Sequence, residues 1–408
     1  MYGKVYYIKD RRIEVYDAMK NLLDMSLEEL PGLSFECSCG KDHSVDIKKL
    51  VVRSNIEEEL VTTLMPFHGE KLFILTDANT YAALGKRVTE RLLEAGFRID
   101  SLMFDAGDSM LLPDERSIGR LMVEAGKDIS LVLAVGSGVL TDIARIVSYK
   151  TGKMFAVAAT APSMDGYASV VSSLLINGKK LTYLGQYPYA IFADTSIMKN
   201  APMIMIQAGY GDVLGKLTAL ADWQLARIVA GEYYCETIAR LVKKGVDKCI
   251  ESSDGLASRD ENSIRRLIEA LVLTGISMGF AGVSRPASGT EHQLAHYWEM
   301  KAIEAGREHP LHGNSVGAAT VVVAELYKLA APMLPEGIEF PKAEFVTKLL
   351  EKAGACTNPA GLGINRDLFV DGMLNSMYIR DKYTLLRFCH DRGKLEQFTE
   401  MLARRFYG

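Results

Sequence analysis

The stretch "ISLVLAVGSGVLTDIARIVSYKTGKMFAVAATAPS", residues 129–163, decides the fold class. It opens with an apolar run over 129–138 that ends in glycines, has helical spacing over 141–153, and returns to an apolar run over 154–163. A continuous apolar run is typical of a strand buried on both faces, and a helix between two such strands forms a crossover unit. The stretch therefore predicts a strand–helix–strand unit of a parallel sheet.

The same alternation extends toward the N-terminus. The segments "KLFILTD" (71–77) and "SLMFDAG" (101–107) are expected strands, whereas 81–97 and 117–127 have the apolar spacing of helices. Strands that alternate with helices predict a doubly wound parallel sheet, and such sheets bind nucleotides at the carboxyl ends of their strands.

Beyond about residue 200 the expected strands stop. Apolar residues there recur with helical spacing up to Phe406, which predicts an all-helical region. We therefore expect an α/β dinucleotide-binding domain over residues 1–198, in which residues 1–55 form an irregular α+β extension. A helical domain is expected over residues 199–408.

The composition excludes several classes of protein. A formal net charge of −4, with 24% charged and 48% hydrophobic residues, disfavours a nucleic-acid binder and suits soluble globular domains. The longest charge-free apolar run, 270–284, is too short to span a bilayer, and no signal peptide is visible. Six cysteines in 408 residues are too sparse for a disulfide framework. We expect a cytoplasmic protein with reduced thiols and no membrane span.

Metal-binding side chains gather in "FECSCGKDHSV" (35–45), which contains Cys37, Cys39 and His43. Structural zinc sites usually combine a C-x₂₋₄-C pair with a second pair of ligands, and this segment has C-x-C with one histidine. We therefore favour a hairpin that turns at Gly40 over a metal site.

Gly136 and Gly138 lie between an expected strand and an expected helix. Glycines at such a turn let backbone N–H groups approach a pyrophosphate, and the helix N-terminus favours the anion. The third glycine of G-x-G-x-x-G is missing, so an ordinary strand–helix turn remains an alternative. Asp77 ends the strand at 71–77, where it would either bind the ribose hydroxyls, which favours NAD over NADP, or cap a helix.

The segment "TAPSMDGYASVVSS" (160–173) is the densest polar stretch in the chain, and it follows a buried strand. Turn and cap chemistry explains some of its hydroxyl groups. A polar stretch at the carboxyl end of a strand is also where a cofactor or a polar substrate is held. Its polar residues are Thr160, Ser163, Asp165, Ser169, Ser172 and Ser173.

Histidine is scarce, yet three of the seven lie close together in the sequence. His292 and His296 are four residues apart and would share one face of a helix, and His312 follows in "LHGNSVGAAT". Asp212, in "GYGDVLGK", would supply a carboxylate. One aspartate and two histidines make a ligand set of the kind found in catalytic divalent-metal sites with open positions. Spacing alone does not bring Asp212 to the histidines.

The order of five motifs resembles the sn-glycerol-1-phosphate dehydrogenases, within the superfamily of iron-type alcohol dehydrogenases, glycerol dehydrogenase and dehydroquinate synthase. The motifs lie between about Lys71 and Thr320, and they are "GSGVLTD", "TAPSMDGYAS", "GYGDVLGK", "SGTEHQLAH" and "LHGNSVG". The resemblance implies an α/β nucleotide-binding domain with a parallel sheet, followed by an all-helical domain that binds metal and substrate. The segment "CxCGxxH" is similar to that of the bacterial members.

Matching the family motifs to this sequence assigns three groups of site residues. The resemblance implies that Asp212, His292 and His312 hold the metal. It implies that Asp165 and His296 are catalytic, and that Asp165, Asp212 and His296 bind the substrate. Together with Asp77, the residues expected to contact the cofactor are Gly136, Ser137, Gly138, Val139, Leu140, Thr160, Ala161, Pro162, Ser163 and Ser169.

Two positions depart from the family pattern. Ser137 replaces the middle glycine of a Gly-Gly-Gly loop, and Asn314 stands where many relatives have glutamate. A phosphate-bearing substrate also needs a cationic contact, for which Lys216 and Arg285 are candidates, although for each of them we favour an ordinary solvated or core-rim charge.

The resemblance implies a metal-dependent enzyme of phospholipid metabolism that uses NAD(H), or NADP(H), to reduce dihydroxyacetone phosphate to sn-glycerol 1-phosphate. It implies nickel or zinc as the metal, a substrate between the two domains, and a homodimer. A glycerol or polyol dehydrogenase of the same superfamily is the first alternative. A dehydroquinate-synthase-like lyase and a non-catalytic NAD-binding sensor are further alternatives, and the sensor would bind no metal.

Overall fold

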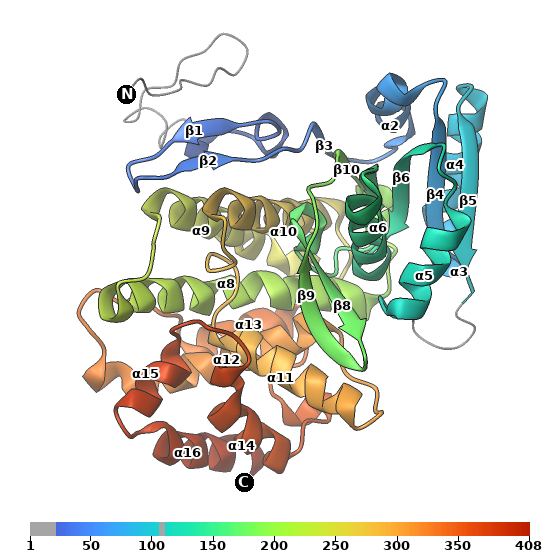
Figure 1. Ribbon diagram of the computed structural model, residues 1–408. Coiled ribbons are helices and arrows are strands. Elements are labelled where there is room, and N and C mark those ends of the chain that lie inside the picture. The colour runs from blue at the N-terminus through green and yellow to red at the C-terminus, as the bar shows by residue number, and fades with distance from the viewer. Residues whose placement is uncertain (1–21, 106–110) are drawn as a thin grey trace. The chain divides into compact units, whose positions relative to one another are not determined.

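The computed structural model describes residues 22–105 and 111–408 (Figure 1). The chain divides into two compact units, Met1–Pro202 and Met203–Gly408. The part of the expected N-terminal extension before Leu22 and the end of the strand expected at 101–107 lie outside the described residues.

A parallel sheet forms the centre of the first unit, and among the described residues it has six strands in the order β3-β10-β7-β6-β4-β5 (Figure 1). The second unit is helical, as described below. These observations confirm the predicted fold class. The strands are β3 (Lys49–Arg53), β4 (Lys71–Asp77), β5 (Arg98–Phe104), β6 (Ile129–Gly136), β7 (Met154–Ala159) and β10 (Ala190–Asp194).

Helices cover both faces of this sheet because successive strand residues point to opposite sides. Alternate residues such as Leu131 and Leu133 of β6 pack with α2 and α4 in one apolar core. Phe155 of β7 points the other way, where the guanidinium of Arg145 in α6 lies 5.4 Å from its ring centroid. The described part of this unit includes the helices α2 (Glu57–Leu64), α3 (Ala78–Thr80), α4 (Lys86–Glu94), α5 (Glu115–Glu124), α6 (Gly138–Thr151) and α7 (Thr195–Met198), with the π-helical turn η3 (Tyr81–Gly85) and the 3₁₀ turns η1 (Leu27–Glu29), η2 (Met65–Phe67) and η4 (Gly166–Ala168).

Some strands of the structure were not predicted individually from the sequence, and β3 is one of them. β3 lies within residues 1–55, where we expected an irregular α+β extension and not a strand of the central sheet, and it pairs with β10 at the edge of that sheet. Its "KLVVR" has three buried residues, too few to stand out as a strand. The antiparallel hairpin of β1 (Ser34–Glu36) and β2 (Asp42–Ser44) turns at Gly40, as predicted. A second antiparallel hairpin, β8 (Val171–Ile176) with β9 (Lys179–Leu184), was not predicted.

The order of the strands reverses between β4 and β6, which are direct neighbours. β5 follows β4 on one side of this point, whereas β7 and β10 extend the sheet on the other side. In open α/β sheets the ligand crevice lies at such a reversal, beyond the carboxyl ends of the strands. The topology therefore singles out the residues that end β4 and β6, which are Asp77 and Gly136.

The second unit is helical throughout its described length (Figure 1). Its central helix, α8 (Met203–Ala230), is buried around much of its circumference and packs against α12 (His312–Ala330). The other helices are α9 (Glu236–Glu251), α10 (Glu261–Ala281), α11 (Thr290–Glu304), α13 (Ala343–Lys352), α14 (Arg366–Asn375), α15 (Leu385–Asp391) and α16 (Leu395–Tyr407), with the short 3₁₀ turns η5 (Ser253–Gly255), η6 (Ala331–Met333), η7 (Ala360–Leu362) and η8 (Ser376–Tyr378).

One helix among the described residues is long and apolar enough to cross a membrane, and it runs from His312 to Met333. In the most apolar 18-residue stretch of this helix, 72% is buried inside the protein. A helix that is apolar on all sides and packed among others has the pattern of a core helix. We therefore interpret α12 as part of the core of the second unit.

Candidate metal centre and nucleotide site

Three helices of the second unit bring the predicted metal ligands together. Asp212 comes from α8, His292 from α11 and His312 from the first residue of α12. One ligand atom of each side chain lies within 4.8 Å of the corresponding atoms of the other two. His292 Nε2 lies 3.4 Å from Asp212 Oδ1. Residues up to one hundred positions apart in the sequence therefore form one cluster.

Glycines next to two of these ligands let α8 and α12 approach closely. A Cβ on Gly313, which follows His312, would lie 1.8 Å from the carbonyl oxygen of Ala208. A Cβ on Gly211, which precedes Asp212, would lie 2.2 Å from the carbonyl oxygen of Gly313. Only a residue without a side chain fits such contacts, so these two glycines set the distance between the Asp212 and His312 backbones.

Two buried glutamates orient the histidine ligands. His292 Nδ1 donates to Glu291 Oε1 at 2.7 Å, and His312 Nδ1 donates to Glu299 Oε1 at 2.8 Å. Glu291 also accepts a hydrogen bond from the Thr218 hydroxyl at 2.8 Å. A carboxylate that binds Nδ1–H fixes the ring and directs Nε2 toward a metal. Neither glutamate was predicted from the sequence, although Glu291 stands directly before His292 in the "SGTEHQLAH" motif.

The electrostatics of the cluster favour ionised carboxylates. Burial opposes the charge on Asp212, but the nearby Lys216 and His292 hold the pKa of Asp212 well below its usual range. Burial and the Lys216 charge oppose protonation of His292, yet its hydrogen bonds with Asp212 and Glu291 raise the pKa of its imidazole overall. A metal binds only neutral imidazole, so metal binding at this cluster releases protons and weakens as the pH falls.

The donor set fits a divalent cation. Bonds of about 2.1 Å to oxygen and nitrogen in tetrahedral geometry place neighbouring ligand atoms about 3.4 Å apart, which agrees with the distance between His292 and Asp212. One carboxylate and two imidazoles would leave a coordination position for a substrate, as catalytic sites require. Nickel and zinc are both compatible with this ligand chemistry.

His296 lies beside this cluster. Its ring stacks on that of His312, with ring centroids 4.8 Å apart, and its Nδ1 lies 3.5 Å from Glu299 Oε2. His296, Glu299 and His312 form a second possible ligand group. Because Glu299 already accepts the hydrogen bond from His312 Nδ1, its contacts with both rings suit a carboxylate that orients two imidazoles.

Neither candidate for the substrate phosphate presents an uncommitted charge. Lys216 is fully buried, and its ammonium donates to Asp212 Oδ1 at 2.5 Å. Arg285 is also buried and forms a two-pronged ion pair with Glu232, in which Nε lies 2.8 Å from Oε2. The structure therefore favours structural roles for both cations.

The expected nucleotide-binding residues follow three neighbouring strands of the first unit. Asp77 ends β4, Gly136 ends β6, and Thr160 follows β7. The Thr160 N–H donates to the Gly136 carbonyl at 3.2 Å, which ties two of these strand ends together. The helix α6 begins at Gly138, so its N-terminus lies at the same edge of the sheet.

Asp77 also has a structural role. Its Oδ1 accepts a hydrogen bond from the Thr80 N–H at 2.8 Å and so caps α3.

The two departures from the family pattern fit the local structure. Ser137 has φ −108°, an ordinary extended conformation, and therefore replaces glycine without backbone strain. The second departure from the family pattern, Asn314, is buried, and its amide donates to the Ile204 carbonyl at 3.3 Å.

The polar segment 160–173 is held in place by a buried arginine. Arg145 of α6 donates to the carbonyl groups of Gly166, Tyr167 and Val171 and pairs with Asp142 at 2.8 Å. Burial raises the pKa of Asp142 to about 6. This role of Arg145 could not be predicted from the sequence, because a buried arginine in a helix has the same sequence pattern as an exposed one.

Not every side chain in the segment is available for a ligand. Ser169 Oγ accepts from the Val171 N–H at 3.0 Å, and Ser172 Oγ donates to the Asp142 carbonyl at 3.0 Å. Asp165 lies at the N-terminal boundary of η4 and is half-buried. The hydroxyl-rich composition of this segment therefore reflects turn chemistry as well as any ligand contact.

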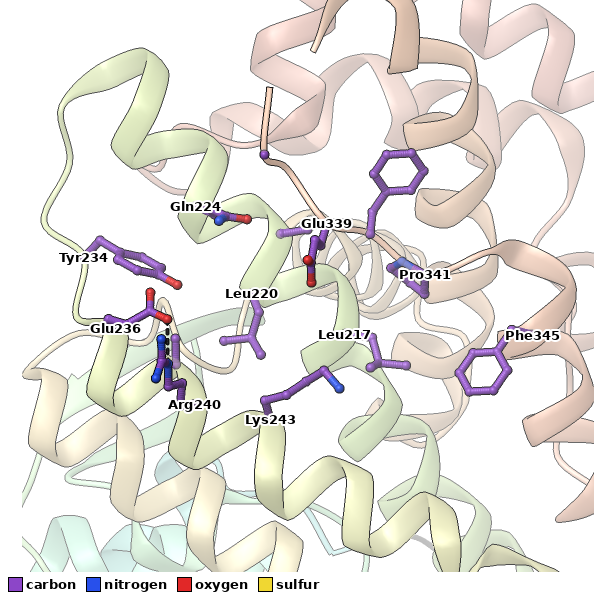
Figure 2. A pocket seen from close by; sticks show the side chains of 14 residues that line it. Leu217, Leu220, Gln224, Tyr234, Glu236, Arg240, Lys243, Glu339, Pro341 and Phe345 are labelled. Atoms are coloured by element: carbon purple, nitrogen blue, oxygen red, sulfur yellow. Dashed lines mark hydrogen bonds and ion pairs between the residues drawn. The ribbon is translucent and has the colours of Figure 1, made fainter. Parts of the chain in front are cut away.

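Figure 2 shows a surface pocket of the second unit. Leu217 and Leu220 of α8 line it together with Arg240 and Lys243 of α9. Arg240 is engaged by Glu236 at 2.8 Å. No ligand of the metal cluster lines this pocket, so it does not contribute to that site.

The sequence is similar to known dehydrogenases. The model of the iron-containing alcohol dehydrogenase family matches residues 51–202. A glycerol-1-phosphate dehydrogenase (NAD(P)+) from Halalkalibacterium halodurans is 34% identical over 385 residues, which cover 88% of this chain and 96% of the relative. Another from Thermococcus kodakarensis is 33% identical, over 78% of this chain and 84% of the relative.

Solved structures show the same fold. The crystal structure of glycerol dehydrogenase from Schizosaccharomyces pombe matches with a TM-score of 0.64 and 15% identity, over 89% of this chain and 93% of the other. At this level of sequence identity the structural similarity supports a shared fold only.

Proposed function

The chain belongs to the glycerol-1-phosphate dehydrogenase family, and from this premise we propose that it reduces dihydroxyacetone phosphate to sn-glycerol 1-phosphate, reversibly, with NADH or NADPH. The observation that carries the proposal is the cluster of Asp212, His292 and His312, with each imidazole oriented by a buried carboxylate. A non-catalytic sensor would have no use for such an arrangement.

We infer a division of work between the two units. In the second unit, Asp212, His292 and His312 would hold nickel or zinc. In the first unit, the strand ends at Asp77, Gly136 and the residues from Thr160 to Ser163 would hold the dinucleotide. When bound, the cation supplies Lewis-acid polarisation of a carbonyl, and the dinucleotide supplies the hydride.

The side chains of this protein would handle the protons. His296 is oriented by Glu299 through Nδ1, so its Nε2 would carry the proton that the product hydroxyl acquires. Asp165 would accept hydrogen bonds from the substrate hydroxyl. The pairing of His292 and His312 with Glu291 and Glu299 keeps both Nδ1 atoms protonated, which preserves the tautomer that ligates through Nε2.

A substrate comparison tests the proposal. The purified protein, loaded with nickel or zinc, is mixed with NADH or NADPH and with dihydroxyacetone phosphate, and loss of the reduced nicotinamide is followed by absorbance. We expect turnover of dihydroxyacetone phosphate and, in reverse, oxidation of sn-glycerol 1-phosphate but not of the 3-phosphate enantiomer. Turnover of glycerol and NAD without any turnover of the phosphates would identify a polyol dehydrogenase instead.

Replacement of His296 by asparagine separates proton transfer from metal binding. We expect the variant to retain its metal, because Asp212, His292 and His312 remain, and to lose about 10²-fold in kcat because the proton-carrying group is gone. Metal content by elemental analysis and steady-state kinetics measure the two effects. Loss of the metal in this variant would favour the alternative ligand group of His296, Glu299 and His312.

Replacement of Asp77 by asparagine tests the cofactor contact. Asparagine keeps the oxygen that caps α3 but removes the charge that would repel a 2′-phosphate. We expect the ratio of kcat/KM for NADPH to that for NADH to rise roughly fivefold, which corresponds to about 1 kcal/mol for one charge near the surface. An unchanged ratio would limit Asp77 to its capping role.

We further propose that the protein works as a homodimer in the cytoplasm. The family suggests a soluble enzyme, and the predominantly buried α12 agrees with that class of protein. Sedimentation of the purified protein measures the oligomeric state directly.

A further inference from the structure

A second cluster of metal-binding side chains lies in the first unit, at the β1–β2 hairpin. Cys37 and Cys39 come from the loop that connects the two strands, and His43 comes from β2. One ligand atom from each of these three residues lies within 4.8 Å of the other two ligand atoms. The Sγ atom of Cys39 lies 3.3 Å from His43 Nε2.

We propose that Cys37, Cys39 and His43 bind a zinc ion that stabilises this hairpin. Zinc bonds of about 2.3 Å to sulfur and about 2.05 Å to nitrogen place the two atoms about 3.6 Å apart in tetrahedral geometry. The distance between Cys39 and His43 is close to that value, so a small adjustment of side chains would complete the site. The proposal is independent of the proposed enzymatic function.

The backbone of the hairpin brings the three ligands together. The expected turn at Gly40 is present, with φ +86° and a hydrogen bond from the Gly40 N–H to the Cys37 carbonyl at 3.0 Å. His43 pairs across the hairpin with Phe35, and their ring centroids lie 5.1 Å apart. The imidazole is therefore fixed by packing, while the turn folds both sulfur atoms toward it.

Burial differs among the ligands in a way that suits metal entry. His43 is fully buried, whereas Cys37 and Cys39 are half-buried and so reachable from solvent. Thiolate and imidazole ligands select zinc over magnesium and calcium, which prefer oxygen.

A structural role follows from the size of the hairpin. Each of its strands has three residues, and an isolated two-stranded hairpin is marginally stable in water. A metal ion that joins the loop to β2 would stabilise the folded hairpin by its binding free energy. The sequence pattern did not favour metal, because C-x-C lacks a second C-x₂₋₄-C pair. The structure adds that His43 returns from the opposite strand to meet the two sulfurs.

The test uses the full chain with the ligands of the second unit removed by Asp212→Asn and His292→Ala. This protein is incubated with zinc sulfate, passed through a desalting column, and analysed for zinc. We expect about one zinc per chain, a value that should fall to background when Cys37→Ser and Cys39→Ser are added. Cys356→Ser, which changes a half-buried cysteine elsewhere, is the matched control and should retain the zinc.

X-ray absorption at the zinc edge, on the protein with all cysteines intact, gives a test that does not depend on the folding of a cysteine variant. We expect sulfur scatterers at about 2.3 Å. Absence of bound zinc, or zinc with only nitrogen and oxygen ligands, would overturn the proposal. Cys37→Ser and Cys39→Ser in the otherwise unchanged chain should leave the metal of the second unit in place, so loss of hairpin zinc is distinguished both from unfolding and from failure of the catalytic site.

Discussion

Replacing His292 with alanine is expected to remove the metal from the second unit and to lower kcat/KM by at least about 10³-fold. Lewis-acid stabilisation by a cation contributes several kcal/mol to a transition state, and each 1.36 kcal/mol corresponds to a factor of ten. His292 would supply one of only three protein ligands, and its Nε2 lies 3.4 Å from the Asp212 carboxylate. Two remaining ligands would hold the cation weakly.

Elemental analysis and steady-state kinetics on the same preparation measure this effect. His390→Ala is the matched control, because His390 is an exposed histidine of α15 and lies outside the cluster. The control should keep both metal and activity. Full activity and full metal content in the His292 variant would refute its assignment as a ligand.

Replacing Gly313 with alanine is expected to lower the free energy of unfolding by roughly 3 kcal/mol or more, and to disrupt the metal centre as well. The added Cβ would lie 1.8 Å from a backbone oxygen of α8, which cannot move aside as a flexible side chain can. Relief of the clash requires α8 and α12 to separate. That separation would move His312, the residue before Gly313, away from Asp212.

Chemical denaturation and metal content together measure this effect. Gly119→Ala is the matched control, because Gly119 lies within α5 and a Cβ there meets no atom within 4 Å. The control substitution should stabilise the protein by about 0.5–1 kcal/mol, since alanine favours a helix more than glycine does. Equal stability of the two variants would show that the close approach of α8 and α12 is not required.

Much of the fold could be predicted from the sequence because its signals were local and strong. The central strands β4, β6 and β7 are continuous apolar runs, and the helices between them have clear periodicity. β3 was not predicted because it is a short edge strand with few apolar residues, and its sequence therefore lacks a clear strand pattern. The β8–β9 hairpin could have been predicted from the dipeptide Asn177–Gly178, which is typical of a two-residue hairpin turn. In the structure both residues have the positive φ angles of such a turn, 50° and 70°.

The candidate site was predictable in part. The family resemblance predicted Asp212, His292 and His312 as metal ligands, and in the structure one ligand atom of each lies within 4.8 Å of those of the other two. Their supporting residues were not predictable, because Glu299 meets His312 only through the packing of two helices. Pairwise contacts of this kind depend on the tertiary structure and leave no periodic pattern in the chain.

The proposed catalysis depends most on a cation bound by Asp212, His292 and His312. A crystal structure of the nickel- or zinc-loaded protein, with anomalous diffraction at the absorption edge of the metal, tests this most directly. We expect an anomalous peak in the second unit, bonded to one oxygen of Asp212 and to the Nε2 atoms of His292 and His312 at about 2.1 Å. A peak held by His296 and Glu299 instead, or no peak in the second unit, would contradict the account.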